Sequence, residues 1–236
     1  MLPVSGEGVQ IGLPVVGDLP DEGFYSLISL IKPPGTKFNK VTNLPVDIAR
    51  NQMVNNLERE WLFMFDADEI VPPEALMRLL SWNLPIVSGI VFLSHIDRPA
   101  PAIYQYAHRK QGKHYYQAKM TEVDDYLTRH KDEQGKDIGV VLTTTREELI
   151  ECDAVGTGCL LVHRSVFEAI KPPYFVLNSG GRASGEDFSF CRKAKRAGFK
   201  IYADPGVLCG HKPKQLIGYQ YFLSWLKASK EVNNNG

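Results

Sequence analysis

The sequence predicts an α/β domain built on a mostly parallel central sheet flanked by helices. Short apolar runs alternate along the chain with segments whose apolar residues recur at helical spacing, which is typical of this fold class. The run Trp-Leu-Phe-Met-Phe at residues 61–65 is apolar throughout, as in a central strand covered on both faces. With 236 residues and 44% hydrophobic residues, the chain can bury a sizeable core.

The first half of the chain reads as alternating strands and helices. Residues 9–16 form a buried strand, and residues 24–31 carry helical apolar spacing. Pro45 and an acidic first turn open a second helix. The remaining elements expected in this half are a short strand at 37–41, the second helix at 47–57, the buried strand at 61–65, a helix begun by Pro72 and Pro73, and a strand at 86–93.

The pattern then breaks and returns. Residues 95–137 form a polar, aromatic-rich stretch that we expect to be a variable loop, because long excursions in compact domains are usually functional or disordered. Order resumes with the elements expected at 155–162 (strand), from about 165 (helix), at 186–197 (helix), and at 201–203 and 207–209 (two short strands). We expect residues 1–213 to form the main domain.

Residues 214–236 are expected to hold an amphipathic helix and a tail. We expect the segment LIGYQYFLSWLK to pack against the body or against a twin subunit in a homodimer, and peripheral membrane contact is the alternative.

Composition narrows the function. The 27 basic residues balance the 27 acidic ones, so no global field draws the chain to nucleic acid. No apolar run approaches the ~18 residues of a transmembrane span, and no signal peptide is visible, so we expect a cytoplasmic protein. The cysteines are scattered without a C-x-x-C pair, which indicates buried free thiols.

Two acidic motifs can carry chemistry. Asp66 and Asp68 follow the strand at 61–65, where they can hold a divalent cation and position a diphosphate. A capped surface turn is the alternative. Glu186 and Asp187 follow a loop containing Gly180, Gly181 and Gly185, which permits close approach of a ligand to a base. A plain helix N-terminus also explains this acidic pair.

His211 follows the last expected strand and is a candidate third metal ligand, although a lone histidine is more often structural.

The ordered segments WLFMFDADEIVPPEAL, AVGTGCLLVHRSVF and ASGEDFSFCRKAKRAGFKIYADPGVLCGH resemble the signature segments of family 2-like GT-A glycosyltransferases, over about residues 9–211. The resemblance implies a GT-A fold of the nucleotide-diphospho-sugar transferase type and a Mn²⁺ or Mg²⁺ cofactor.

By this resemblance Asp66 touches the donor ribose, Asp68 binds the divalent cation, and His211 is a further metal ligand. Asp66 also belongs to this metal site. Asp187 is then the catalytic base, with Glu186 beside it. The match also assigns further residues to the donor site: Arg50 and Asn51 to the nucleotide pocket, and Gly156 and Gly158 to the donor sugar. A solvent-facing helix turn and a strand bulge are the respective alternatives.

The chain departs from the family at the base-reading segment, which appears as PVVGDLPDEG and leaves Asp18 as the candidate. The nucleotide therefore stays open between UDP and GDP. No Q-x-x-R-W segment follows His211, which implies non-processive transfer. Tyrosines of the 95–137 loop can form a lid over a sugar; a solvated loop and single-stranded nucleic acid binding are the alternatives. We expect no nucleic acid partner.

The resulting hypothesis is an inverting glycosyltransferase that moves a sugar from a nucleotide-diphosphosugar to a glycan, lipid or protein acceptor. Retention of configuration is the mechanistic alternative. The rival functions are a metal-dependent phosphatase of the aspartate-nucleophile type and a catalytically silent nucleotide or carbohydrate binding module.

Overall fold

The structure is a computed structural model that describes residues 6–93, 100–110, 113–118, 127–131, 137–142, 148–177 and 185–211. The helix expected within 214–236, the glycines Gly180 and Gly181, and parts of the 95–137 stretch lie outside the described residues. Within the described part, no helix is long and apolar enough to cross a membrane.

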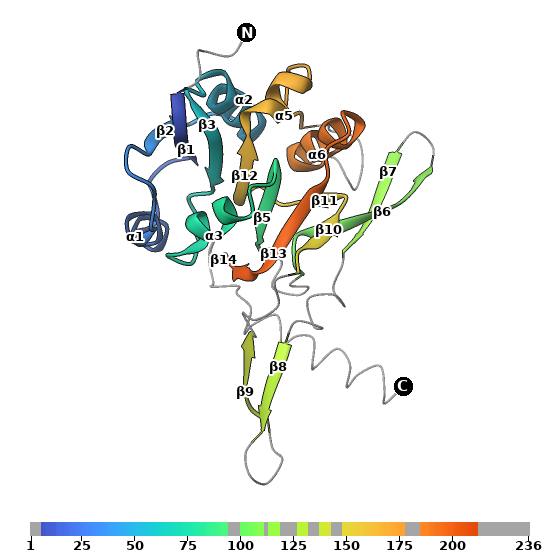
Figure 1. Ribbon diagram of the computed structural model, residues 1–236. Helices are drawn as coiled ribbons and strands as arrows, with labels where there is room; N and C mark the ends of the chain where they lie inside the picture. Colours follow the sequence, from blue (N-terminus) through green and yellow to red (C-terminus); the bar gives the residue numbers. More distant parts are fainter. Residues whose placement is uncertain are drawn as a thin grey trace.

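A mixed seven-stranded sheet in the order β10-β13-β5-β12-β3-β1-β2 forms the centre of the molecule (Figure 1). Strands β1, β2 and β3 run parallel, as do β5 and β13, whereas β12 is antiparallel to both β3 and β5, and β10 is antiparallel to β13. The strands are β1 (Gly6–Val15), β2 (Lys37–Thr42), β3 (Arg59–Phe65), β5 (Ile86–Ile90), β10 (Ile150–Cys152), β12 (Cys159–His163) and β13 (Ile201–Leu208). The predicted α/β class with a mostly parallel sheet is confirmed.

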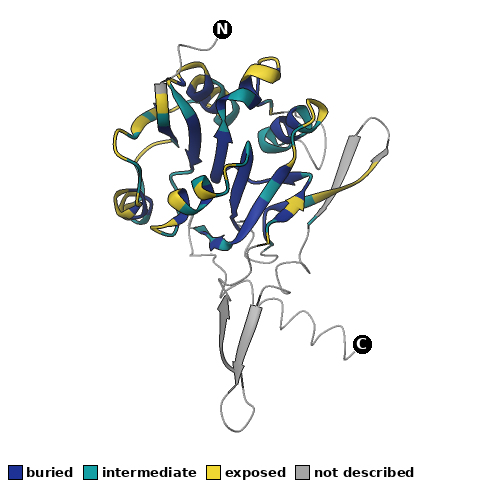
Figure 2. Ribbon diagram, viewed as in Figure 1, coloured by how far each residue is buried: buried dark blue, intermediate teal, exposed yellow. Residues whose placement is uncertain are grey.

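Helices cover both faces of this sheet, and strand β3 shows how. Leu62 and Met64 pack into one cluster with helices α2, α5 and α6, while Phe63 and Phe65 point into the other cluster with α1 and α3. All four side chains are fully buried, and Figure 2 shows the central strands largely in dark blue, the colour of buried residues. The helices are α1 (Asp21–Ser29), α2 (Val46–Asn55), α3 (Ala75–Ser81), α5 (Arg164–Ala169) and α6 (Glu186–Arg196).

The last expected pair of strands is one strand. Asp-Pro-Gly between residues 201–203 and 207–209 reads as a turn, but β13 runs through it, with a register shift against β5 between Asp204 and Leu208. Asp204 is fully buried there and has partners for its carboxylate. Arg78 Nε and the Trp82 indole N–H each donate a hydrogen bond of 2.7 Å to its Oδ2. Partnered burial thus overrides the turn signal.

The 95–137 stretch, expected to be a variable loop, contains paired strands. Strands β6 (Ile103–Lys110) and β7 (Lys113–Ala118) pair with each other, and β6 also pairs with β11 (Ala154–Val155). Strand β8 (Leu127–Lys131), within the stretch, pairs antiparallel with β9 (Asp137–Leu142), which extends beyond it. The four cysteines are free and buried, as predicted.

Candidate functional site

The segment after β3 places the first acidic motif at the carboxyl edge of the sheet. Asp66 N–H donates to the Gly158 carbonyl at 3.1 Å, and Glu69 N–H donates to the Asp66 carbonyl at 3.0 Å, which closes a turn. The chain then enters β4 (Glu69–Ile70), which pairs antiparallel with β14 (Gly210–His211). This pairing brings His211 beside the Asp66 to Asp68 turn.

Helix α1 supports the same turn from the opposite side. A Cβ added to Gly23 would lie 1.8 Å from the Ala67 carbonyl oxygen, so only glycine allows this approach. The buried Ser26 hydroxyl accepts from Val71 N–H at 2.8 Å and donates to the Val71 carbonyl at 3.1 Å. Neither residue was singled out from the sequence, because a glycine or serine inside a helical segment carries no local sign of a distant contact.

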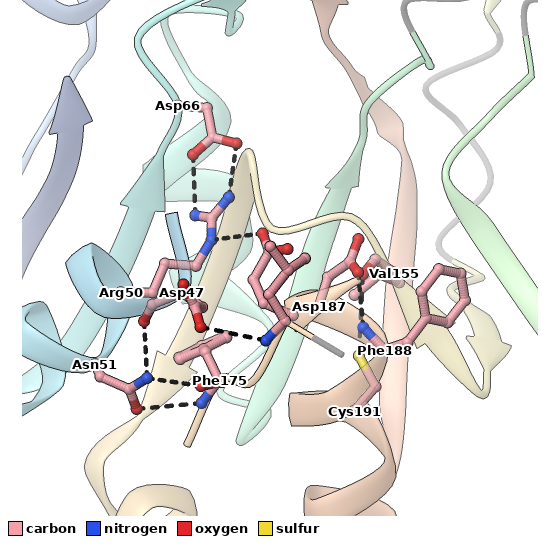
Figure 3. Close-up of polar contacts among 11 residues, drawn as sticks. Asp47, Arg50, Asn51, Asp66, Val155, Phe175, Asp187, Phe188 and Cys191 are labelled. Carbon is pink, nitrogen blue, oxygen red and sulfur yellow. Dashed lines mark hydrogen bonds and ion pairs between the residues drawn. The ribbon is translucent and has the colours of Figure 1, made fainter. Parts of the chain in front are cut away.

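Arg50 of α2 joins the two acidic motifs (Figure 3). Its guanidinium donates to both carboxylate oxygens of Asp66 at 2.9 Å, and its Nε donates to Glu186 Oε1 at 3.2 Å. The Arg50 side chain is 3% exposed. Burial by itself lowers the pKa of Arg50, but the charges and hydrogen bonds of Asp66 and Glu186 outweigh it, so the net pKa is raised. Arg50 is therefore a permanent cation between the two motifs.

Asp187 has a different environment at the start of α6. Its Oδ1 accepts a hydrogen bond from Phe188 N–H at 2.7 Å. Burial, followed by the negative charge of Glu186, raises its pKa to about 6. The ring of Tyr104 lies 4.8 Å from that of Phe188, and burial together with the charge of Asp187 raises the pKa of the Tyr104 hydroxyl. A carboxyl group with a pKa near neutrality is suited to proton transfer.

Glu69 is the site residue that the sequence interpretation missed. The residue is 3% exposed, its Oε1 lies 2.8 Å from His211 Nδ1, and its Oε2 has no hydrogen-bond partner among the described residues. Burial raises the pKa of Glu69 to about 7. For His211, burial lowers the pKa, but the hydrogen bond and charge of Glu69 raise it overall. The sequence signal that could have identified Glu69 is its position directly after Asp68.

The donor set at this edge fits a divalent cation in part. His211 Nε2 faces Asp68 Oδ2 at 3.7 Å, and Glu69 holds the other ring nitrogen, the arrangement by which carboxylates orient histidine ligands. Carboxylate and imidazole groups are suitable ligands for Mn²⁺. Both oxygens of Asp66 bind Arg50 instead. Across the described part of the chain, no group of three His, Cys, Asp or Glu side chains converges as a metal site.

A cavity of about 380 Å³ opens beside the acidic turn. Asp18, after β1, lies in its wall together with Asp66 and Asp68. The other lining residues are Pro14, Val16, Pro20, Leu44, Val46 and Ala67. The structure thus brings Asp18, which is distant in sequence, to the same cavity as the D-x-D motif.

Three predicted donor-site residues have structural contacts of their own. The Asn51 amide donates to the Asp47 and Phe175 carbonyls at 2.7 Å each and accepts from Tyr174 N–H at 2.6 Å. A Cβ on Gly156 would lie 2.6 Å from Val91 Cγ2, and one on Gly158 would lie 2.9 Å from Glu69 Cγ. Close packing accounts for both glycines, and their contact with a donor stays a prediction.

Comparisons with known proteins support the fold. No protein-family model matches the chain, and no curated protein matches its sequence. Among solved structures, A197 from STIV is similar with a TM-score of 0.52 and 15% identity, over 86% of this chain and 85% of that one. GalNAc-T7 with UDP, GalNAc and Mn²⁺ is similar with a TM-score of 0.54 and 13% identity. This match covers 86% of the chain but 43% of GalNAc-T7.

The chain has a GT-A type of fold. At these identities the likeness concerns the fold alone, and the predicted GT-A architecture is confirmed at that level.

Proposed function

We propose that the protein is a glycosyltransferase that moves a sugar from a UDP- or GDP-linked donor to an acceptor hydroxyl. The observation that carries the proposal is the contact of Arg50 with both Asp66 and Glu186. Through it, the D-x-D turn with its cavity and the acidic pair of α6 form one site. The GT-A fold and the match to a UDP-bound structure support the same function.

The donor would occupy the cavity bordered by Asp18, Asp66 and Asp68. Arg50 offsets the charge of Asp66 and so reduces repulsion of an anionic diphosphate. Asp68 and His211 would hold Mn²⁺ or Mg²⁺, with Asp66 next to them. When bound, such a cation neutralises negative charge on the departing nucleotide diphosphate.

Asp187 would act on the acceptor. Its carboxylate takes the proton of the acceptor hydroxyl while that oxygen bonds to the anomeric carbon and the bond from this carbon to the diphosphate oxygen breaks. A single displacement of this kind inverts the anomeric configuration. Glu186 is fixed by Arg50 and raises the pKa of Asp187 through its charge. NMR of the product anomer tests this step, because a retained configuration contradicts Asp187 as the base.

Calorimetric titration tests the donor site. We would titrate UDP-, GDP-, CDP- and dTDP-sugars with and without Mn²⁺ into the native chain, Asp68→Ala and the control Asp21→Ala, whose side chain is exposed on α1. Metal-dependent binding that is lost in Asp68→Ala and kept in Asp21→Ala supports the proposal. Absence of binding to every donor contradicts it. Phosphate release from simple esters would instead indicate the phosphatase, and binding without turnover the silent module.

A further inference from the structure

The Tyr104 side chain lies close to Asp187, the proposed base. The Tyr104 carbonyl accepts from Asp153 N–H at 2.8 Å, where β6 pairs with β11. The ring lies 4.8 Å from that of Phe188, the residue after Asp187, and packs against both core clusters. Tyr104 is thus a fixed residue of the body of the domain, which distinguishes it from a lid that closes over a sugar.

Two polar atoms beside each other in sequence and space are open to a ligand here. Asp187 Oδ1 accepts from Phe188 N–H at 2.7 Å (Figure 3), and a Cβ on Gly185 would lie 2.5 Å from it, so this oxygen is enclosed. Within the described part of the chain, neither Asp187 Oδ2 nor the Tyr104 hydroxyl has a hydrogen-bond partner. Neither is a fully buried atom, because the buried unpartnered side-chain atoms of that part belong to Arg59 and Glu69.

These two groups differ in the hydrogen bonds that they can form. Burial, followed by the charge of Asp187, raises the pKa of the Tyr104 hydroxyl, so the phenol stays protonated at neutral pH. A protonated phenol donates one hydrogen bond and can accept another, whereas an ionised carboxylate only accepts. The phenol is therefore suited to bind an oxygen of the ligand, and the carboxylate to take a proton from one.

The chemistry of the transfer favours two different ligand oxygens for these two groups. The oxygen that gives its proton to Asp187 uses a lone pair to attack the anomeric carbon. A hydrogen bond donated to that same oxygen would be stronger before the attack than during it, and would oppose the reaction. Tyr104 is compatible with transfer when it binds a neighbouring oxygen of the acceptor instead.

We propose that Tyr104 binds a second hydroxyl of the acceptor, next to the one that loses its proton to Asp187, and that the acceptor is therefore a saccharide. The inference rests on the proposed glycosyl transfer and narrows its acceptor to one class. Adjacent hydroxyls are present on a sugar ring, whereas a serine or threonine side chain or a simple lipid alcohol offers a single hydroxyl. Tyr104 also has the apolar ring and polar tip that suit such a ligand.

Saccharide binding can be measured without a donor sugar. We would titrate methyl glycosides of glucose, galactose, mannose and N-acetylglucosamine by saturation-transfer NMR, with and without UDP or GDP and Mn²⁺. Tyr104→Phe removes only the hydroxyl, and Tyr25→Phe, at a residue that is 65% exposed on α1, is the matched control. We expect Kd to rise about three- to tenfold in Tyr104→Phe, as for loss of one hydrogen bond, and to stay native in Tyr25→Phe. Binding of no glycoside by the native chain, or an unchanged Kd in Tyr104→Phe, overturns the inference.

Monodeoxy analogues of the bound glycoside separate a contact from a change in structure. For one analogue, the native chain should bind about three- to tenfold more weakly than it binds the parent glycoside, because the hydroxyl that Tyr104 contacts is missing. Tyr104→Phe should bind this analogue and the parent equally. If Tyr104→Phe discriminates among the analogues as the native chain does, its hydroxyl does not contact the saccharide and the inference fails.

Kinetics with the bound glycoside as acceptor distinguish this inference from the proposed function. In Tyr104→Phe the KM for the glycoside should rise about three- to tenfold with a much smaller change in kcat, since a binding contact is lost and the base is kept. Calorimetry with the nucleotide sugar checks the donor site. A native chain that binds no donor contradicts the proposed function, while the glycoside titrations still decide whether Tyr104 binds a saccharide. A fall in kcat with an unchanged KM overturns the inference.

Discussion

Two aspartates of the site, Asp66 and Asp187, lie in opposite electrostatic settings. Asp66 meets a buried guanidinium that binds both of its oxygens. Asp187 is buried beside the like charge of Glu186, and these two causes raise its pKa to about 6 although the hydrogen bond from Phe188 N–H acts in the other direction. The comparison separates a fixed ion pair from a buried carboxyl group whose near-neutral pKa suits the proton transfer that we propose for it.

The largest effect is expected on catalysis, for a change of Asp187, the proposed base. Asp187→Asn keeps the shape of the side chain but removes the base, so kcat should fall by about 10²- to 10⁴-fold while donor binding is retained. Steady-state kinetics together with donor calorimetry measure the two properties separately. An equal loss in Asp187→Asn and in a variant of the exposed Asp21 would contradict the assignment.

The second-largest effect is on stability and is expected for Arg50, which forms the buried ion pairs. Arg50→Met leaves the carboxylates of Asp66 and Glu186 without their shared partner, which should lower the free energy of unfolding by about 3–5 kcal/mol. Urea denaturation measures the change. Lys37→Met, which removes one member of an exposed ion pair, is the control and should have a much smaller effect. A native-like midpoint for Arg50→Met would show that the buried ion pairs do not hold the site together.

These two settings differ in how far they could be predicted from the sequence. The apolar run of β3 and the D-x-D motif are adjacent in the chain, so a local pattern predicted both the central strand and the position of Asp66 at its end. The acidic pair and its helix were predicted in the same way. The contact of Arg50 with both acidic motifs was not predicted, because Arg50 reaches Glu186 only after the chain has folded.

Long-range pairing also explains the other differences. Glu69 meets His211 because β4 pairs with β14, and no local pattern indicates that two such short strands will pair. The antiparallel direction of β12 is equally a property of the assembled sheet. Two short strands were expected at 201–203 and 207–209 instead of the single β13, because the burial of Asp204 between them depends on partners such as Arg78 from another element.

A smaller effect is expected from Gly23, which lets α1 approach the D-x-D turn. In Gly23→Ala the added methyl group would clash with the Ala67 carbonyl, and overpacking of this kind costs about 1–3 kcal/mol. We expect a lower melting temperature and weaker donor binding, since the turn carrying Asp66 and Asp68 must shift. Thermal denaturation and calorimetry check the two outcomes. Unchanged values for both would show that α1 does not position the turn.

The smallest effect is a shift of the pH profile, and it tests the cause assigned to the raised pKa of Asp187. Because the base must be ionised, kcat/KM should fall as the pH drops below about 6, approaching tenfold per pH unit. Glu186→Gln removes a neighbouring negative charge, which makes ionisation of Asp187 easier, so its pKa falls and the acid limb moves to lower pH. A limb that stays in place would assign the raised pKa to burial alone. A limb that moves to higher pH would contradict the electrostatic link between the two carboxylates, and with it the proposed role of the Arg50-bound Glu186.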